Sequence, residues 1–307
     1  SILIINRKQD FLERLHWEFC IFGTNLVLIL HWDLGVIIVF GCVTNLILLY
    51  RLKQKMINFK KQNHNIFNLD AVSLLKKIPD NSIDIIVTDP AYSGMNNHLK
   101  LGKGRIVGKY KDKGEKGKWF EEFIDTEENY SIFLNECFRV LKEKSHIYIM
   151  FDSYSLLSLG SLVRKYFPVK NIIVWDKAII GMGHYFRRQS EFILFSSKGK
   201  KPVSNRSTND VWSIKRIVRS KYPTQKPVEL FSKMILSSKL KNEKNLVVCD
   251  PFLGSGSAAI AAIKNNCKFI GGDISKTAIR ISKERIDTYL RKNIDILEDK
   301  KIKKWNR

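Results

Sequence analysis

The chain has 307 residues, of which 44% are hydrophobic, so it can bury a sizeable core and is not an intrinsically disordered protein. Lysine and arginine number 53 against 30 aspartates and glutamates, and the net charge of +23 indicates a polyanionic partner: nucleic acid first, a membrane surface second. The five cysteines contain no C-x-x-C pair, so we expect neither a zinc site, nor another metal, nor a disulfide framework.

The first 55 residues differ in character from the rest of the chain. Leu34 to Tyr50 is an uncharged run with basic residues after it, which is near the lower length limit for a membrane span. The first methionine is Met56, so the stretch can equally be an upstream extension of the reading frame, and a soluble core helix is a third interpretation. We therefore expect an apolar extension at 1–55, with a membrane tether only if it is native, and an enzyme-like domain at 56–307.

Phe67 to Pro79 predicts a short extended entry followed by a helix, because its apolar residues recur at near-helical spacing until the proline. Asp70 stands at the start of that helix. It is either an N-cap or a ligand group, and the cap is the simpler interpretation.

A β-branched run from Ile83 to Val87 predicts a strand buried on both faces, which Asp89-Pro90 ends at the carboxyl edge of a sheet. Open α/β sheets keep their chemistry at that edge. There Asp89 offers an acceptor-only carboxylate, Pro90 fixes the backbone behind it, and Tyr92 adds a large ring. The arrangement suits a flat amine such as a nucleobase, and an ordinary Asp-Pro turn explains these residues equally well when they are taken alone.

A flexible cationic loop is predicted next, within an insertion at 93–130. Leu99 to Lys118 combines eight basic residues with two acids and five glycines, so it can close over a phosphate backbone. A merely solvated charge run is the alternative. The candidate nucleic-acid-binding residues of the loop are Lys100, Lys103, Arg105, Lys109, Lys111 and Lys113.

The following elements alternate between helices and strands. Strands separated by helices imply a mostly parallel sheet, and the close-set later pair implies an antiparallel edge hairpin, whose loop adds Arg187 and Arg188 as candidate nucleic-acid-binding residues. The expected class is α/β, doubly wound, with a short polar recognition segment at 197–221. The predicted helices are Trp119–Leu141, Ser153–Tyr166, Val228–Leu240 and Lys276–Lys292, and the predicted strands are His146–Phe151, Asn171–Trp175 and Glu191–Ser196.

A complete strand, glycine loop, helix and strand unit spans Leu246 to Asp273. Gly254 and Gly256 allow the backbone to turn tightly and approach a ligand, and Asp273 lies at the distance where a carboxylate accepts hydrogen bonds from ribose hydroxyls. The loop opens with Asp250, a negative charge where a pyrophosphate would otherwise lie. A cationic adenosyl group therefore fits better than a nicotinamide cofactor.

Three ordered motifs resemble those of the S-adenosylmethionine-dependent DNA amino-methyltransferases, in the β-class order that puts the catalytic motif before the cofactor motif. They are DPAY at Asp89–Tyr92, YPTQKPVEL at Tyr222–Leu230 and DPFLGSGS at Asp250–Ser257. The resemblance runs from about residue 65 to residue 290 and implies a Rossmann-like methyltransferase fold, S-adenosylmethionine as cofactor and double-stranded DNA as partner. In one departure from the family, Ala91 replaces the second proline of the catalytic box and loosens its turn.

The resemblance also implies roles for individual residues. Asp89 and Tyr92 hold a flipped base, and the carbonyl of Pro90 is a second acceptor for its amine. The expected cofactor-binding residues are Asp70, Thr224, Lys226, Asp250, Phe252, Gly254, Gly256 and Asp273.

The expected reaction is methyl transfer to an exocyclic amine, with N6 of adenine favoured and N4 of cytosine as the alternative. The sequence has no Pro-Cys nucleophile, which disfavours methylation of a ring carbon. A catalytically silent nucleic-acid-binding module is the alternative from another class. Restriction-modification, a cytoplasmic, nucleoid-associated location and a homodimer are expectations of the same resemblance.

Overall fold

A computed structural model describes residues 16–22, 25–32, 35–42, 63–90, 124, 126–181, 185–218, 220, 222 and 224–298. The chain divides into two compact units, Ser1–Ile57 and Asn58–Arg307, and each is described by itself.

The first unit contains a three-stranded antiparallel sheet. Its strands are β1 (His16–Phe22), β2 (Asn25–Trp32) and β3 (Gly35–Cys42), in the order β1-β2-β3. The uncharged run that begins at Leu34 therefore enters a strand, and its last residues, 43–50, lie outside the described part. Among the described residues, no helix has both the length and the apolar character needed to cross a membrane.

An eight-stranded sheet in the order β4-β11-β10-β5-β6-β8-β7-β9 forms the centre of the second unit. The first five strands across the sheet, β4-β11-β10-β5-β6, are parallel to one another, whereas β8 runs antiparallel to both of its neighbours, β6 and β7. The mostly parallel α/β class is thus confirmed. The strands are β4 (His64–Phe67), β5 (Ile83–Thr88), β6 (Leu141–Phe151), β7 (Val169–Asp176), β8 (Ser190–Lys198), β9 (Val211–Ser213), β10 (Val247–Asp250) and β11 (Lys268–Gly272).

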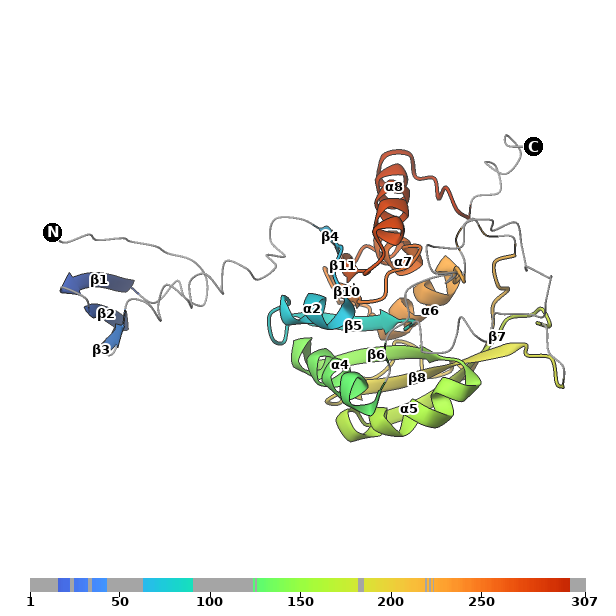
Figure 1. Ribbon diagram of the computed structural model, residues 1–307, viewed down its shortest axis with the longest axis horizontal. Coiled ribbons are helices and arrows are strands. Elements are labelled where there is room, and N and C mark those ends of the chain that lie inside the picture. Colours follow the sequence, from blue (N-terminus) through green and yellow to red (C-terminus); the bar gives the residue numbers. More distant parts are fainter. Residues whose placement is uncertain are drawn as a thin grey trace. The chain divides into compact units, whose positions relative to one another are not determined.

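Helices cover both faces of this sheet, as a doubly wound fold requires (Figure 1). One group, α2, α4 and α5, packs together on one face, and the other group, α6, α7 and α8, packs on the opposite face. The helices are α2 (Ala71–Lys76), α4 (Glu127–Val140), α5 (Ser153–Tyr166), α6 (Val228–Ser238), α7 (Ser257–Lys264) and α8 (Lys276–Lys292).

Three boundaries differ from the sequence-based expectation. Helix α4 begins at Glu127 rather than Trp119, because the hydroxyl of Thr126 caps it by accepting a hydrogen bond from the backbone N–H of Asn129. Strand β6 follows α4 directly at Leu141. Strand β9 lies within the polar segment 197–221, where no strand was expected. It pairs parallel to β7 and forms an edge of the sheet, so the β7–β8 hairpin does not form that edge as expected.

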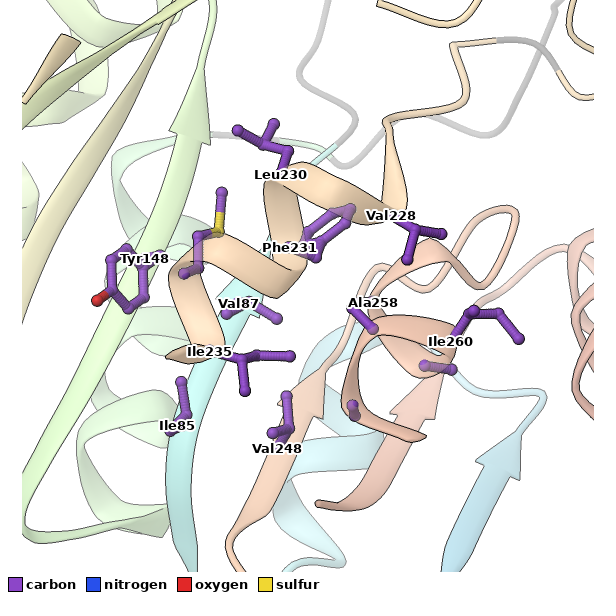
Figure 2. Close-up of a cluster of buried hydrophobic side chains, with 14 of the residues drawn as sticks. Ile85, Val87, Tyr148, Val228, Leu230, Phe231, Ile235, Val248, Ala258 and Ile260 are labelled. Atoms are coloured by element: carbon purple, nitrogen blue, oxygen red, sulfur yellow. The ribbon is translucent and has the colours of Figure 1, made fainter. Parts of the chain in front are cut away.

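The core explains why the β-branched run of β5 is a central strand. Ile85 and Val87 face α6, where they pack with Phe231 and Ile235 in one buried cluster (Figure 2). Ile86, between them, is also fully buried, and strand geometry turns it to the other face. Burial on both faces fixes β5 in the middle of the sheet and so fixes the position of the turn that follows it.

Candidate active site

Four aspartates gather at one edge of the large sheet. Asp70 follows β4, Asp273 follows β11, Asp250 ends β10 and Asp89 follows β5. These four strands are neighbours and run parallel, so their carboxyl ends meet at the same edge. The two Asp-Pro turns that the sequence singled out therefore lie on one rim.

A cavity of about 460 Å³ lies along this rim. Its volume falls within the range of small-molecule sites, roughly 300 to 1,000 Å³. The predicted site residues that line it are Asp70, Asp89, Pro90, Thr224, Lys226, Asp250, Phe252, Gly254 and Asp273. The structure thus brings together three segments that are far apart in the sequence.

Asp250 is the most deeply buried carboxylate of the cavity, with 2% of its surface exposed. Its Oδ1 accepts hydrogen bonds from the Thr88 hydroxyl at 3.2 Å and from the Phe252 N–H at 3.0 Å. Among the ion pairs of the described residues, none involves Asp250. Burial raises the pKa of Asp250 to about 8. A ligand that brings a positive charge would therefore stabilise its ionised form.

The glycine loop after β10 is held by backbone and side-chain contacts. Gly254 has φ +49° and donates its N–H to Oδ2 of Asp273 at 2.8 Å. Gly256 has φ +79°, and a Cβ there would lie 3.1 Å from the side chain of Ser282 in α8. Gly256 is not among the residues that line the cavity, so its place in the structure is the tight turn into α7 and the close approach of α8.

Asp273 and Asp70 close the other end of the cavity. Asp273 accepts one backbone hydrogen bond on each oxygen, from Gly254 and from Ser275 at 2.8 Å, and each oxygen keeps a further lone pair for a ligand. Burial raises the pKa of Asp273. Asp70 is the N-cap of α2, accepting the N–H of Ser73 at 2.9 Å, so the cap interpretation is confirmed for a residue that also lines the cavity.

Lys226 connects the two Asp-Pro turns. Its side chain is 9% exposed, its ammonium pairs with Oδ2 of Asp89, and it lies 3.6 Å from Oε2 of Glu191. Its backbone carbonyl accepts a hydrogen bond from the hydroxyl of Ser257, at the start of α7, at 2.7 Å. Burial lowers the pKa of Lys226, but the two carboxylates raise it by more, so the ammonium stays charged.

Asp89 is the more accessible of the two turn carboxylates, with 24% of its side chain exposed. Burial raises its pKa, and the neighbouring acids Glu191 and Asp152 add to this rise, while Lys226 opposes it. Sequence reasoning missed Glu191 as part of the site. It stands near the start of β8, and because β8 runs antiparallel to β6, that start lies at the same rim.

Arg285 is a second residue that sequence reasoning missed. Its side chain is 0% exposed, and its guanidinium donates one hydrogen bond to each carboxylate oxygen of Asp295, both at 2.7 Å. It also donates to the backbone carbonyl of Ser255 at 3.0 Å, which ties the glycine loop to α8. In the sequence, Arg285 lies among other charged residues of a helix, a pattern typical of a solvent-exposed helix face. Nothing in the local sequence therefore indicated that it is buried.

The candidate nucleic-acid-binding residues divide into two groups. Arg187 donates to the carbonyl of Gly181 at 2.8 Å, and the guanidinium of Arg188 lies 4.7 Å from the ring centre of Tyr154. Tyr154 belongs to the first turn of α5, which starts at the cavity's rim after β6. The other nucleic-acid-binding candidates, Lys100, Lys103, Arg105, Lys109, Lys111 and Lys113, lie outside the described residues. So does Tyr92, the third catalytic candidate.

Comparison with known proteins agrees with this geometry. A family model described as DNA methylase matches residues 83–284, a range that includes both Asp-Pro turns. The type II methyltransferase M2.LlaDCHI of Lactococcus lactis subsp. cremoris is 29% identical over 251 residues, which cover 75% of this chain and 91% of that protein. The DNA adenine methyltransferase YhdJ of Escherichia coli (strain K12) is 28% identical over 270 residues, which cover 75% and 84%.

A solved structure shares the fold. It is that of the PvuII DNA methyltransferase (cytosine-N4-specific), with a TM-score of 0.56 and 14% sequence identity, covering 79% of this chain and 91% of the other. The Rossmann-like methyltransferase architecture predicted from the motifs is thereby confirmed.

Proposed function

Since this chain belongs to the N6/N4 family of DNA methylases, we propose that it transfers a methyl group from S-adenosylmethionine to N6 of adenine in double-stranded DNA. One observation carries the proposal for this chain: the Asp89 and Asp250 turns lie on one rim and line one cavity. A cofactor on one turn and a base on the other would then face each other.

The cavity residues fit the cofactor by charge and by hydrogen bonding. Asp250 is a buried carboxylate without an ion-pair partner among the described residues, and an ammonium group would supply the missing charge. Asp273 has free acceptor capacity for ribose hydroxyls, and Gly254 leaves the backbone open to close approach. Bound there, S-adenosylmethionine would supply a methyl group made electrophilic by a positively charged sulfur.

Asp89 and Pro90 would act on the other reactant. The exocyclic amine of a base is a weak nucleophile, because its lone pair is delocalised into the ring. If Asp89 accepts one N–H and the carbonyl of Pro90 accepts the other, the nitrogen becomes pyramidal and its lone pair is available. The carboxylate then stabilises the positive charge that develops on nitrogen and is the acceptor for the proton it loses.

The base has to leave the duplex to reach this carboxylate. Flipping costs a few kcal/mol, and stacking on an aromatic ring, the role we propose for Tyr92, offsets part of that cost. The basic insertion, with Arg187 and Arg188 at the rim, would neutralise phosphates and make DNA binding strongly dependent on salt.

Adenine is favoured over cytosine by the D-P-x-Y form of the catalytic box and by the likeness to a DNA adenine methyltransferase. The fold itself is shared with a cytosine-N4-specific enzyme and does not separate the two bases.

Mass spectrometry of nucleosides from DNA of cells that express the full chain tests the proposal. We expect N6-methyladenine above the level of cells carrying the empty vector. Detection of N4-methylcytosine instead would change the proposed target base to cytosine but support the proposed methyl transfer. Unmodified DNA, in cells whose protein is soluble and binds the cofactor, would favour the silent nucleic-acid-binding module.

A further inference from the structure

The ammonium of Lys226 lies where the proposed target amine has to bind. Both are N–H donors, and Oδ2 of Asp89, which the reaction needs as an acceptor, is already paired with Lys226. The sequence resemblance had assigned Lys226 to the cofactor. Its backbone does contact the cofactor turn, through Ser257, but its side chain reaches the base side of the cavity.

A second carboxylate stands next to this pair. Oε2 of Glu191 is 3.6 Å from the Lys226 ammonium, and Oε1 of Glu191 is 3.1 Å from the ammonium of Lys177. A lysine side chain has a flexible four-carbon stem with a compact charge at its end. Lys226 can therefore move from Asp89 to Glu191 by a small change of its side chain, so that its ammonium stays paired with a carboxylate and remains a neighbour of Asp89.

We propose that Lys226 is a positioning residue that holds Asp89 ionised until a base enters and then moves onto Glu191, freeing Oδ2 of Asp89 for the target amine. The inference rests on the proposed function and deepens it. Lys226 keeps its proton throughout, so the exchange moves a charged group and no bond is made or broken.

The charges around Asp89 show why such a cation is needed. Glu191 and Asp152 raise the pKa of Asp89 by their charge, so both favour its protonated form, and the charge of Asp89 in turn raises the pKa of Asp250. Lys226 alone among the described basic residues forms an ion pair with Asp89. A neutral base brings no charge of its own, so without Lys226 the carboxylate would take up a proton and lose its role as an acceptor.

The first test is the pH dependence of methyl transfer by the full chain carrying Lys226→Met, measured with tritiated S-adenosylmethionine on genomic DNA. Without the lysine, the pKa of Asp89 rises further, and once it exceeds 7 the fraction ionised at pH 7 falls about tenfold for each additional unit. We expect at least about a tenfold loss at pH 7 that recovers as the pH is raised towards 9.

Lys142→Met is the matched control, because Lys142 also pairs with an aspartate, Asp84 at 2.9 Å, but among the described ion pairs it meets neither Asp89 nor Glu191. Its pH profile should coincide with that of the wild type. The inference is overturned if the Lys226→Met profile also coincides with the wild type, or if this variant binds cofactor normally and stays inactive across the whole pH range.

Glu191→Gln provides a second test that keeps both Lys226 and Asp89. Without the second carboxylate, Lys226 stays on Asp89, so the KM for DNA should rise several-fold while kcat changes less. An unchanged KM would contradict the exchange, and it would do so even if Lys226→Met failed to fold. A wild-type chain that transfers no methyl group would instead refute the proposed function, so the two failures are distinguishable.

Discussion

Asp89-Pro90 and Asp250-Pro251 are the same dipeptide on adjacent parallel strands, yet their surroundings are opposite. Asp89 has 24% of its side chain exposed and a lysine on its carboxylate. Asp250 is 2% exposed, and among the described residues only neutral donors, the Thr88 hydroxyl and the Phe252 N–H, form hydrogen bonds with its carboxylate. The dipeptide is the same, so the lysine beside Asp89 comes from what the tertiary fold places against that turn.

This contrast matches the charge of the ligand that each turn is proposed to meet. A neutral base cannot keep a buried carboxylate ionised, so the protein supplies Lys226. A cationic cofactor can keep a buried carboxylate ionised, so at Asp250 the described residues supply hydrogen bonds and the ligand would supply the positive charge. The presence or absence of a resident cation therefore distinguishes two aspartates that motif matching treats alike.

The largest effect is expected for Asp89→Asn. The change keeps the shape of the side chain but removes the charge that stabilises the reacting nitrogen, so methyl transfer should fall by about 10² to 10³, while cofactor affinity stays close to that of the wild type. Tritium transfer and calorimetric cofactor binding measure the two quantities. Asp84→Asn is the matched control, since Asp84 lies on the same strand and also pairs with a lysine, Lys142, at 2.9 Å.

Asp250→Asn should produce the reverse pattern. Loss of the buried countercharge should weaken cofactor binding by about 10- to 100-fold, or roughly 1.4 to 2.8 kcal/mol, with a smaller effect on the rate at saturating cofactor. Calorimetry on the variant gives the dissociation constant. If the affinity does not change, the cofactor's positive charge is not what Asp250 recognises, and the comparison between the two turns fails.

A third effect concerns stability against pH in the absence of cofactor. Asp250 has a folded-state pKa of about 8, above an unfolded value of roughly 3.9, so its contribution to stability is fully present below the unfolded value and is lost as the pH rises towards 8. The melting temperature of the wild type should therefore fall more between pH 5 and 8 than that of Asp250→Asn, by about 2 to 4 °C for each kcal/mol. Parallel curves for the two proteins would show that burial does not raise this pKa.

The smallest effect is expected for Arg188→Ala, which touches neither turn. DNA affinity should fall modestly, and the slope of log affinity against log salt should become less steep by about one, because one phosphate contact is lost. Cofactor affinity should stay the same. Arg164→Ala is the control, since Arg164 lies in the last turn of α5, far along the helix from the rim, and should leave the slope unchanged.

The rim could be predicted from the sequence because its signals are local. A buried β-branched strand before Asp89, and a strand with a glycine loop before Asp250, are both read within about ten residues, and parallel pairing then brings their ends together. The cap at Asp70 is equally local. The short strand β9 gave no such signal, because three residues are too few to show a periodicity.

The partners of the turns could not be predicted, because they depend on contacts between distant segments. Lys226 is 137 residues from Asp89 in the chain, and Glu191 reaches the site only because β8 reverses direction. Arg285 is buried by the segment around Asp295, which follows the last helix. The resemblance assigned Lys226 to the cofactor rather than to Asp89, and Glu191 and Arg285 look like ordinary surface residues until the fold is known.

The reversal of β8 has a consequence for how this enzyme can diversify. Because β7 ends and β8 begins at the same rim, the connection between them leaves and returns at the edge where Asp89, the proposed catalytic carboxylate, lies. The ladder from Asn171↔Phe195 to Asp176↔Ser190 anchors both ends of this connection. Residues can be inserted or exchanged there without shifting the register that holds Glu191. The β7–β8 connection is thus a place where changes of sequence could alter the preferred target while the proposed chemistry at the rim stays unchanged.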